Sequence, residues 1–402
     1  MQMRKKTIII LGGGYAGLTA AARLAEQDMF AVTLIDRNSH FHERVRLHEI
    51  AAGRPYRSFA YRDMLEPRGT AFRQARVESL DPARNHVELA TSDGGTASLD
   101  ADYILYALGS TMDQGAIPGL AAYGHSLADF GAALAGLGKL QVLDAPRIVI
   151  GGGGLTALEL AAELAEVRPD AAVTLVPGNG LSANNHPGGF HPKAVAHIRK
   201  VLERLGISVI DGDYISAVDA GQALTTGGRS LCFDLYLHAS GFRIPDLAKR
   251  SGIATDDDGR ILTDWSLRAV SHPSIFAIGD AAIARTAESN PSRLSCATAM
   301  PMGASVARSL ADIAAGKAPQ PHVTGYAFRN VSLGRADGVI QFLDNEDRPL
   351  ADVWTGTKAA KWKEYICRTT LHTMRLAEQP ERPAMPPIRL LPHLMQHAKK
   401  IA

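Results

Sequence analysis

The sequence predicts an α/β protein with two doubly wound parallel sheets, followed by a small α+β region at the C-terminus. Two segments about 140 residues apart share one plan: residues 7–38 and 147–179 each contain a β-branched strand, a glycine cluster, an Ala/Leu-rich helix and a second β-branched strand. Each copy also has a later apolar strand that ends in Ala-x-Gly, within residues 102–113 and 234–246. Duplicated βαβ units of this kind form parallel sheets covered by helices.

The composition is that of an ordinary globular chain. Its 402 residues are 46% hydrophobic and 21% charged, which is enough for two or three domains with their own cores. The formal charge of +2 argues against a dedicated nucleic-acid-binding protein. The cysteines Cys232, Cys296 and Cys367 are far apart, which excludes a disulfide framework and favours a reduced, cytoplasmic setting. Glycines interrupt the uncharged stretch at residues 7–22, so we expect no transmembrane segment.

Gly12, Gly14 and Gly17 form a G-x-G-x-x-G cluster between the first strand and its helix. The first glycine allows a tight turn, the second lets the backbone approach a pyrophosphate, and the third lets the helix pack closely on the strand. The phosphates would bind free N–H groups at the helix N-terminus. Asp36 ends the second strand, within reach of a ribose hydroxyl. We therefore expect a dinucleotide here.

Gly152, Gly154 and Ala157 form the second cluster, and alanine is an accepted third residue. Pro177 stands where an acid would end the second strand of this copy. The sequence therefore does not choose between NADH and NADPH. A degenerate site that no longer binds a nicotinamide coenzyme stays open as an alternative.

The two copies divide the chain into three units. We predict a first unit, a second unit and a C-terminal unit, formed by residues 1–112 with 246–325, residues 113–245, and residues 326–402. Residues 274–280 have the pattern of a strand followed by Gly-Asp, with a helix expected after Asp280. In the C-terminal unit, residues 339–343 are predicted as a strand and 358–379 as a helix.

Four motifs resemble those of the two-dinucleotide-binding flavoproteins, the FAD-dependent pyridine nucleotide oxidoreductases. They occur in the family's order within residues 5–320: GGGYAG at 12–17, Ala-Leu-Gly at 107–109, GGGGLTALE at 151–159 and Ile-Gly-Asp at 278–280. The chain is most similar to type II NADH dehydrogenases and apoptosis-inducing-factor-like quinone reductases. The resemblance implies two Rossmann-type domains, with FAD in the first unit and NADH or NADPH in the second.

The resemblance also assigns roles to single residues. Asp36 should bind the adenosine ribose of FAD, and Gly279 and Asp280 its pyrophosphate and ribityl end. Glu159 is the catalytic candidate because it matches a family position close to flavin and nicotinamide, although the helix dipole alone also favours an acid there. The expected cofactor-binding residues are Gly12, Gly14, Tyr15, Ala16, Gly17, Asp36, Arg37, Arg44, Val77, Ala107, Leu108, Gly109, Gly152, Gly154, Leu155, Thr156, Gly241, Gly279, Asp280, Ala297 and Thr298.

The chemistry implied by the resemblance is hydride transfer from NAD(P)H to flavin and electron transfer to an acceptor, which needs no catalytic triad or metal. Residues 37–60 contain no cysteine, so neither disulfide reduction nor sulfide oxidation, which needs paired cysteines, is expected. Quinone-reducing relatives carry an Ala-Gln-x-Ala-x-Gln stretch, whereas residues 296–302 contain no glutamine. We expect a quinone-like acceptor. A soluble reductase of another carrier or small metabolite, and a non-catalytic, redox-responsive flavin-binding protein, are the alternatives.

Residues 40–49 contain three histidines and two glutamates. Their spacing matches no familiar ligand set, so we predict no metal site. In the family this loop runs beside the flavin, where Arg44 or Arg46 would neutralise negative charge on the reduced ring.

The tail, residues 357–402, carries five Lys and four Arg against three Glu. It also carries the apolar and aromatic residues Trp362, Tyr365, Ile366, Leu371, Met374 and Leu376. This combination favours peripheral contact with an anionic surface at the inner face of the membrane. A solvated helix, or docking on a second copy in a homodimer, are the other interpretations.

Overall fold

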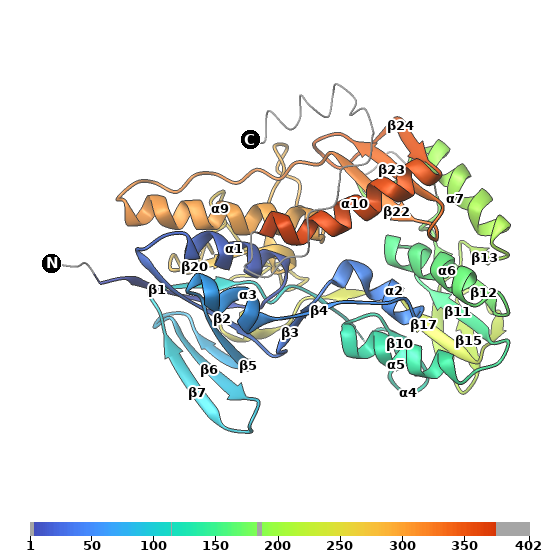
Figure 1. Cartoon of the computed structure of the whole chain (residues 1–402), viewed down its shortest axis with the longest axis horizontal. Helices are drawn as coiled ribbons and strands as arrows, with labels where there is room; N and C mark the ends of the chain where they lie inside the picture. Colours follow the sequence, from blue (N-terminus) through green and yellow to red (C-terminus); the bar gives the residue numbers. More distant parts are fainter. Residues whose placement is uncertain (1–3, 114, 183–186, 375–402) are drawn as a thin grey trace.

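The computed structural model describes residues 4–113, 115–182 and 187–374. Two lobes lie side by side, and the C-terminal elements lie across both (Figure 1). The first lobe contains a seven-stranded sheet in the order β20 (Ile275–Ala277), β8 (Tyr103–Tyr106), β1 (Lys6–Leu11), β2 (Phe30–Asp36), β5 (Ala71–Asp81), β6 (His86–Thr91) and β7 (Thr96–Asp100). The strands from β20 to β5 are parallel, and β5, β6 and β7 form an antiparallel meander.

The second lobe contains a five-stranded sheet in which every pair is parallel. Its order is β10 (His125–Ser126), β17 (Leu235–His238), β11 (Arg147–Gly151), β12 (Ala172–Gly178) and β13 (Ser208–Asp211). The two predicted parallel sheets are therefore confirmed. The central strands β1, β8, β11 and β17 consist mostly of buried apolar residues, because core clusters cover both faces of each sheet.

The helices follow the glycine clusters as predicted. In the first lobe α1 (Tyr15–Ala25) packs against α9 (Cys296–Ala314), and a Cβ added to Gly303 would lie 2.4 Å from the Ala16 carbonyl oxygen. The second lobe contains α5 (Phe130–Gln141), α6 (Leu155–Val167) and α7 (Pro192–Arg204), and α2 (Leu47–Ala51) of the first lobe packs against α5 and α6. A short ribbon of β9 (Thr111–Met112) and β18 (Phe242–Arg243) joins the lobes.

The remaining elements are short. They are β3 (His40–His42), β4 (Ser58–Ala60), α3 (Tyr61–Leu65), α4 (Leu120–Tyr123), β14 (Ile215–Asp219), β15 (Gln222–Thr225), β16 (Ser230–Cys232), α8 (Leu247–Arg250), β19 (Ile261–Leu262), β21 (Ala282–Ile283) and single 3-10 turns at Arg44–Arg46, Glu66–Arg68 and Gly279–Ala281.

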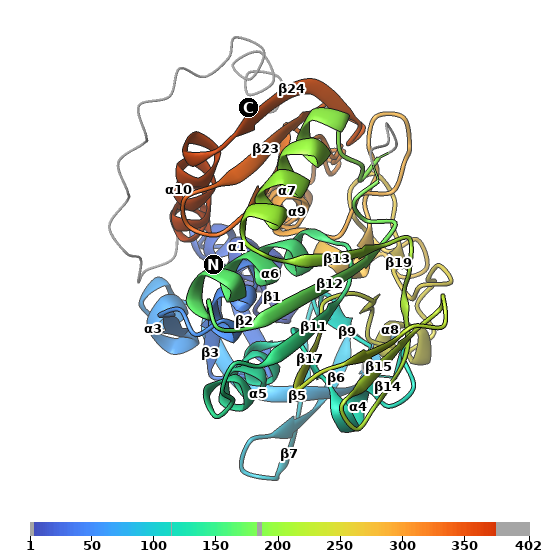
Figure 2. The ribbon, with the colours of Figure 1, turned by 90° about the vertical axis from the view of Figure 1, so that its right-hand side faces the viewer.

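The C-terminal unit is an antiparallel sheet with one helix. It consists of β22 (Phe328–Ser332), β23 (Gly338–Leu343), β24 (Pro349–Thr355) and α10 (Thr357–Met374). The strand predicted at 339–343 is therefore present, and the helix predicted at 358–379 is present over its described residues. Figure 2 shows α7 of the second lobe beside β23, with α10 on the other side of this sheet. The unit therefore contacts the second lobe through its strands and the first lobe through α10, which packs on α1.

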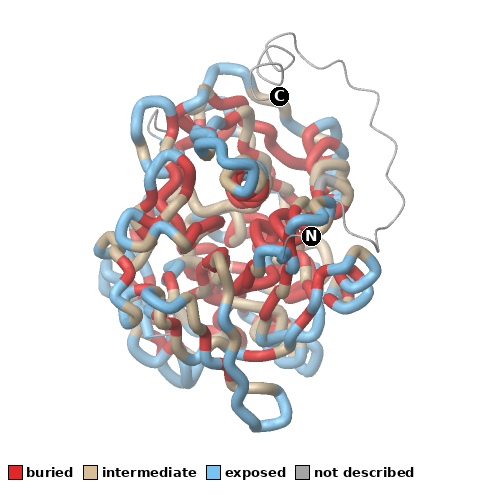
Figure 3. Tube along the Cα trace, turned by 90° about the vertical axis from the view of Figure 1, so that its left-hand side faces the viewer, coloured by how far each residue is buried: buried red, intermediate tan, exposed pale blue. Residues whose placement is uncertain are grey.

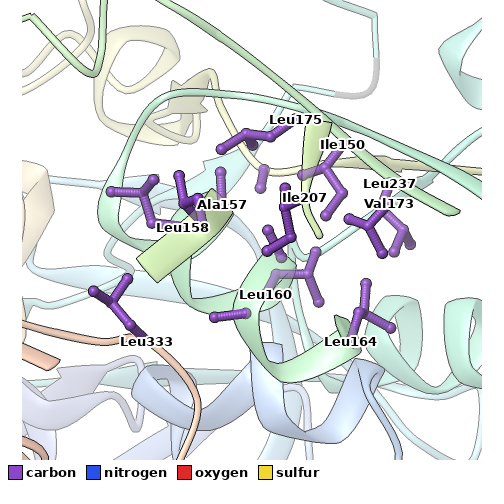
Figure 4. Packing of buried hydrophobic residues seen from close by; sticks show 14 of the residues in the cluster. Ile150, Ala157, Leu158, Leu160, Leu164, Val173, Leu175, Ile207, Leu237 and Leu333 are labelled. Carbon is purple, nitrogen blue, oxygen red and sulfur yellow. The ribbon is translucent and has the colours of Figure 1, made fainter. Parts of the chain in front are cut away.

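Buried segments occupy the interior of the molecule, and exposed segments form its rim (Figure 3). The core of the second lobe extends into the C-terminal unit, because Leu333, in the turn after β22, joins the cluster formed by Ile150, Leu158 and Leu237 (Figure 4). This shared core fixes the C-terminal unit against α6.

One expectation is wrong. Asp280 does not lead directly into a helix: the turn at Gly279–Ala281 continues into β21, which pairs with β19, and the next helix starts at Cys296. The membrane contact expected of residues 357–402 stays a prediction, because the structure describes only residues 357–374 of this segment. Trp362, Leu371 and Met374 are buried in the protein. Tyr365 and Ile366 are partly buried and pack against the apolar cluster that contains Trp362 and Phe342.

Residues 375–402, the rest of the tail, lie outside the described residues. Within the described ranges, no helix is long and apolar enough to cross a membrane.

Candidate cofactor and coenzyme sites

The first glycine turn lies at the carboxyl end of β1. Gly12 has a φ of +104°, and a Cβ there would lie 2.4 Å from the Ala107 carbonyl oxygen. A Cβ on Gly17 would lie 2.0 Å from the Gly12 carbonyl oxygen, whereas one on Gly14 would meet nothing within 4 Å. The turn thus has the three properties that a pyrophosphate-binding loop requires: a sharp bend, an open backbone and close helix packing.

Two side chains hold the middle peptide of this turn. Asp36 Oδ2 accepts a hydrogen bond from the Gly13 N–H at 2.7 Å, and the Tyr61 hydroxyl donates to the Gly13 carbonyl oxygen at 2.9 Å. Burial, with the nearby Asp36 carboxylate, raises the pKa of Tyr61 well above its usual value, so this hydroxyl remains a donor. Sequence analysis did not identify Tyr61, because nothing in its local pattern marks it as a partner of the turn.

A second group of polar residues gathers at the Gly-Asp turn. Asp280 Oδ2 accepts from the Ser110 hydroxyl at 2.6 Å, and Arg44 Nη1 donates to the Ser110 carbonyl oxygen at 2.6 Å. The Arg44 guanidinium also lies 5.2 Å from the centre of the Phe242 ring. Four distant segments, including the ribbon that joins the lobes, therefore meet here. Ser110 and Phe242 were not predicted.

The residues fit FAD. Within the described ranges, the Tyr15 hydroxyl and Arg44 Nη2 are buried without a hydrogen-bond partner. Buried polar atoms normally have partners, so two unpaired ones beside an open glycine turn indicate a polar ligand. Gly109, with a φ of +64°, also faces open space. A flavin dinucleotide supplies both the anionic pyrophosphate and the polar ring that these groups would bind.

The other predicted flavin residues are more spread out. Arg37 is exposed and pairs with Asp129 of the second lobe at 3.0 Å. Val77 lies in β5 beyond its pairing with β2, facing Leu89 of β6. Ala297 and Thr298 lie in the first turn of α9, where Ser295 caps the helix by accepting from the Thr298 N–H. Ala16 follows Tyr15 in α1, and Leu108 lies between Ala107 and Gly109 in the segment that leaves β8.

The second glycine turn repeats the backbone of the first. Gly152 has a φ of +140°, and a Cβ there would lie 2.7 Å from the Ala239 carbonyl oxygen. A Cβ on Gly154 would meet nothing within 4 Å, and Leu155 and Thr156 open helix α6. Gly241 follows β17 at the same edge of the sheet. This turn can also hold a pyrophosphate.

Glu159 lies one turn into α6, where it is 5% exposed. It forms an ion pair with Lys363 of α10 and accepts from the Ser332 N–H at 3.1 Å. His48 of α2 approaches it, with Nδ1 3.5 Å from Oε2. Glu159 therefore lies where both lobes and the C-terminal unit meet. Burial lowers the pKa of Lys363, so its ammonium group releases a proton more readily than an exposed lysine does.

Further ion pairs surround this junction. Arg46 binds Glu49 at 2.9 Å and Glu364 of α10 at 3.1 Å. Arg335 binds Glu49 at 2.9 Å and Glu163 of α6 at 3.1 Å. Arg46 therefore links α2 to α10. That Arg44 or Arg46 balances charge on the flavin stays a prediction, and Arg44 is the one of the two with an unpaired buried nitrogen.

The histidines of residues 40–49 do not converge on one point in the fold. His48 is buried beside Glu159, whereas the His42 ring stacks on Phe130 at 3.6 Å between ring centres. Across the residues with described positions, no three His, Cys, Asp or Glu side chains are arranged to hold a metal ion.

Lys363 was not predicted as a site residue, although the sequence carries a signal for it. Ala359, Lys363, Cys367 and Leu371 recur at helical spacing, and all four are buried. A lysine on an otherwise apolar stripe indicates a buried cation with a buried partner. Treating the segment as a basic tail hid this pattern.

The three cysteines are free. Cys232 is exposed, and burial raises the pKa of both Cys296 and Cys367 to about 11. Thiols with such pKa values remain protonated at neutral pH and react poorly.

Comparisons with known proteins agree with this architecture. The model of the pyridine nucleotide-disulphide oxidoreductase family matches residues 6–308. An NADH dehydrogenase-like protein of Mycobacterium tuberculosis is 29% identical over 74% of this chain and 78% of its own length. The type II NADH:quinone oxidoreductase of Staphylococcus haemolyticus is 26% identical over 91% of this chain and 95% of its own. The structure of NDH2 from Plasmodium falciparum in complex with NADH superposes with a TM-score of 0.79 at 15% identity, covering 92% of this chain and 96% of that one.

Proposed function

The chain belongs to the pyridine nucleotide-disulphide oxidoreductase family and is an NAD(P)H-dependent flavin oxidoreductase, and on that premise we propose that it carries FAD and passes electrons from NAD(P)H to a quinone-like acceptor. The observation that carries the proposal is the pair of open glycine turns, one at the carboxyl end of each parallel sheet of one chain. Ligands of such sheets bind at this edge.

The first turn, Asp36, Arg44 and Asp280 would hold FAD, and the second turn would hold the coenzyme. When bound, FAD accepts a hydride from NAD(P)H and gives its electrons to an acceptor. Arg44 donates to the Ser110 carbonyl oxygen through Nη1, and its Nη2 is unpaired. The side chain therefore places a positive charge beside Asp280. A fixed cation in a partly buried site stabilises negative charge that develops there.

Glu159 and Lys363 would supply a proton. A quinone that accepts two electrons also takes up two protons, so a buried acid near the site speeds its reduction. The Lys363 ammonium group is paired with Glu159 and has a lowered pKa, which suits a group that holds and releases a proton. The Ser332 N–H fixes the carboxylate of Glu159 while this occurs.

Quinone as the acceptor is supported by the relatives. The match to the staphylococcal quinone oxidoreductase spans 91% of the chain and so extends past residue 308 into the C-terminal unit that carries Lys363. One feature favours a different electron carrier instead: the first turns of α9 contain Met300, Pro301 and Met302 and no glutamine.

The test is an anaerobic titration of the flavin absorbance with NADH and NADPH, followed by mixing of the reduced protein with a short-chain ubiquinone. We expect the coenzyme to bleach the flavin absorbance rapidly and the quinone to restore it rapidly. Glu159→Gln should keep FAD but slow the return by about a hundredfold, because proton transfer by a placed acid contributes roughly that much.

Glu166→Gln is the matched control, because Glu166 lies on the same helix, is partly exposed, and binds the Arg54 guanidinium and the backbone N–H of Arg335, each at 2.9 Å. It should leave both steps unchanged. Reoxidation by the quinone no faster than by dioxygen would contradict the quinone assignment, and a flavin that neither coenzyme bleaches would contradict the whole proposal.

A further inference from the structure

The end of β12 departs from the usual dinucleotide-binding pattern. Pro177 occupies the place of the acid that binds the adenosine ribose, and Gly178 follows with a φ of +57°. The Gly178 carbonyl oxygen accepts from the Gly212 N–H at 2.9 Å, which holds this end of β12 against the segment after β13. A carboxylate is therefore absent at this position of the described strand, and the backbone is fixed without it.

An aromatic ring lies at this position instead. A Cβ added to Gly178 would lie 2.3 Å from Cε1 of Tyr214 and 2.8 Å from its Cδ1 and Cζ, so the ring packs directly on the glycine backbone. Tyr214 is nevertheless 50% exposed. One part of the ring is thus covered by the sheet edge and much of the rest faces solvent.

The backbone of Tyr214 is held on both sides. Its N–H donates to Asp213 Oδ1 at 3.0 Å, and its carbonyl oxygen accepts from the Thr226 N–H at 2.8 Å. Asp213 is itself buried and accepts from the Thr226 hydroxyl and the Gly227 N–H. An exposed ring on a rigid support loses little entropy when a flat ligand stacks on it.

Arg199 and Asp211 form an ion pair at this edge. Arg199 of α7 donates to both carboxylate oxygens of Asp211, at 2.6 and 3.1 Å, and to the Leu181 carbonyl oxygen at 3.3 Å. It is therefore engaged, and a 2′-phosphate would have to compete with Asp211 for it. No carboxylate ends β12 to repel that phosphate.

We propose that Tyr214 is an aromatic platform for the adenine of the coenzyme, which takes over the anchoring role of the missing acid, so that the site binds the NADH and NADPH forms with similar affinity. The inference rests on the proposed function in placing the coenzyme at the second glycine turn. Adenine would stack on the exposed part of the ring, as bases do on aromatic side chains.

Calorimetric titration of the FAD-loaded protein with ADP-ribose and 2′-phospho-ADP-ribose tests this. The two dissociation constants should agree within about tenfold, since β12 ends without a carboxylate and Arg199 is already paired with Asp211. Tyr214→Ala should weaken both by about tenfold or more, and Tyr214→Phe should bind like the natural protein, because the stacking surface is kept.

Tyr123→Ala is the matched control, since Tyr123 lies in the same unit and is 47% exposed. It should change neither affinity. Unchanged or tighter binding by Tyr214→Ala, no binding by the natural protein, or a difference between the probes beyond about tenfold, would each overturn the proposal.

Neither probe carries a nicotinamide ring, so the binding result is independent of flavin reduction. A protein that binds both probes through Tyr214 but whose flavin is not reduced by NADH would uphold this inference while the proposed function fails.

Discussion

The two glycine turns have nearly the same backbone but are supported differently. In the first, side chains bind both backbone groups of Gly13: Asp36 accepts from its N–H, and Tyr61 donates to its carbonyl oxygen. In the second, Gly153 packs on backbone, and a Cβ there would lie 2.1 Å from the Pro177 carbonyl oxygen. A cofactor that stays bound gains from many directional contacts, whereas a coenzyme that must leave after each turnover does not. The contrast fits the proposal that the first unit holds a resident cofactor and the second an exchanging coenzyme.

The largest effect is expected when the same substitution, glycine to alanine, is made in each of the two turns. Gly12→Ala adds a Cβ 2.4 Å from a backbone oxygen in a conformation that L-residues avoid, at a cost of about 3 kcal/mol or more. We expect protein purified without FAD. Gly152→Ala, where the Cβ lies 2.7 Å from a backbone oxygen, should keep its FAD and lose reduction by NAD(P)H.

Flavin content and flavin reduction, measured on the same preparations, distinguish the two results. If both variants lost FAD equally, the assignment of different ligands to the two turns would be wrong. Gly138→Ala, in α5 and with nothing within 4 Å of the added Cβ, is the control for a glycine without such a role.

A smaller effect is expected at Asp36, the acid that the second unit lacks. Asp36→Asn removes the charged acceptor of the Gly13 N–H, and hydrogen bonds to charged groups contribute about 2 kcal/mol, so FAD should bind about thirtyfold more weakly. Fluorescence of free flavin on dilution measures this. Asp28 is an exposed acid before β2, so Asp28→Asn should leave FAD binding unchanged. Equal loss of FAD in both variants would show that Asp36 acts only through net charge.

Much of this architecture follows from local patterns. The β-branched runs before Gly12 and Gly152 and the Ala/Leu-rich runs after them predict both parallel sheets, because buried parallel strands and glycine-bounded helices have distinct compositions. The position of Gly279 and Asp280 after a strand was likewise predictable, although the short strand after Asp280 was not. Its pairing with β19 depends on chain that is close only in space.

The residues that join the units were not predictable in the same way. Lys363 and Glu159 are about 200 residues apart, and each alone has an ordinary explanation, as a basic-tail residue and as an acid near a helix start. Tyr214 and Gly178 are close only because β13 returns the chain to the end of β12. Contacts of this kind depend on the assembled fold rather than on any local pattern.

The smallest effect is expected at the contact between the two lobes, where His48 of the first lobe approaches Glu159 of the second. Burial, reinforced by Lys363, Arg335 and Arg46, lowers the pKa of His48 well below the usual 6.5, so it is neutral in the folded protein. In the unfolded chain it gains a proton as the pH falls below about 6.5, and the unfolded state then binds more protons than the folded one. Stability should therefore fall with decreasing pH from this point, by about 1.4 kcal/mol per pH unit for this one group.

His48→Gln should be less stable near neutral pH but should lose less stability on acidification. Urea unfolding at about pH 7.5 and about pH 5.5 measures the two slopes, and the difference between them isolates His48 from the other buried histidines. His322→Gln is a useful comparison, since burial lowers the pKa of His322 to about 4 at a site away from the lobe contact. If only the His322 change flattened the slope, the contact between the lobes would tolerate a charged His48, and the neutral imidazole would not be what holds α2 against α6.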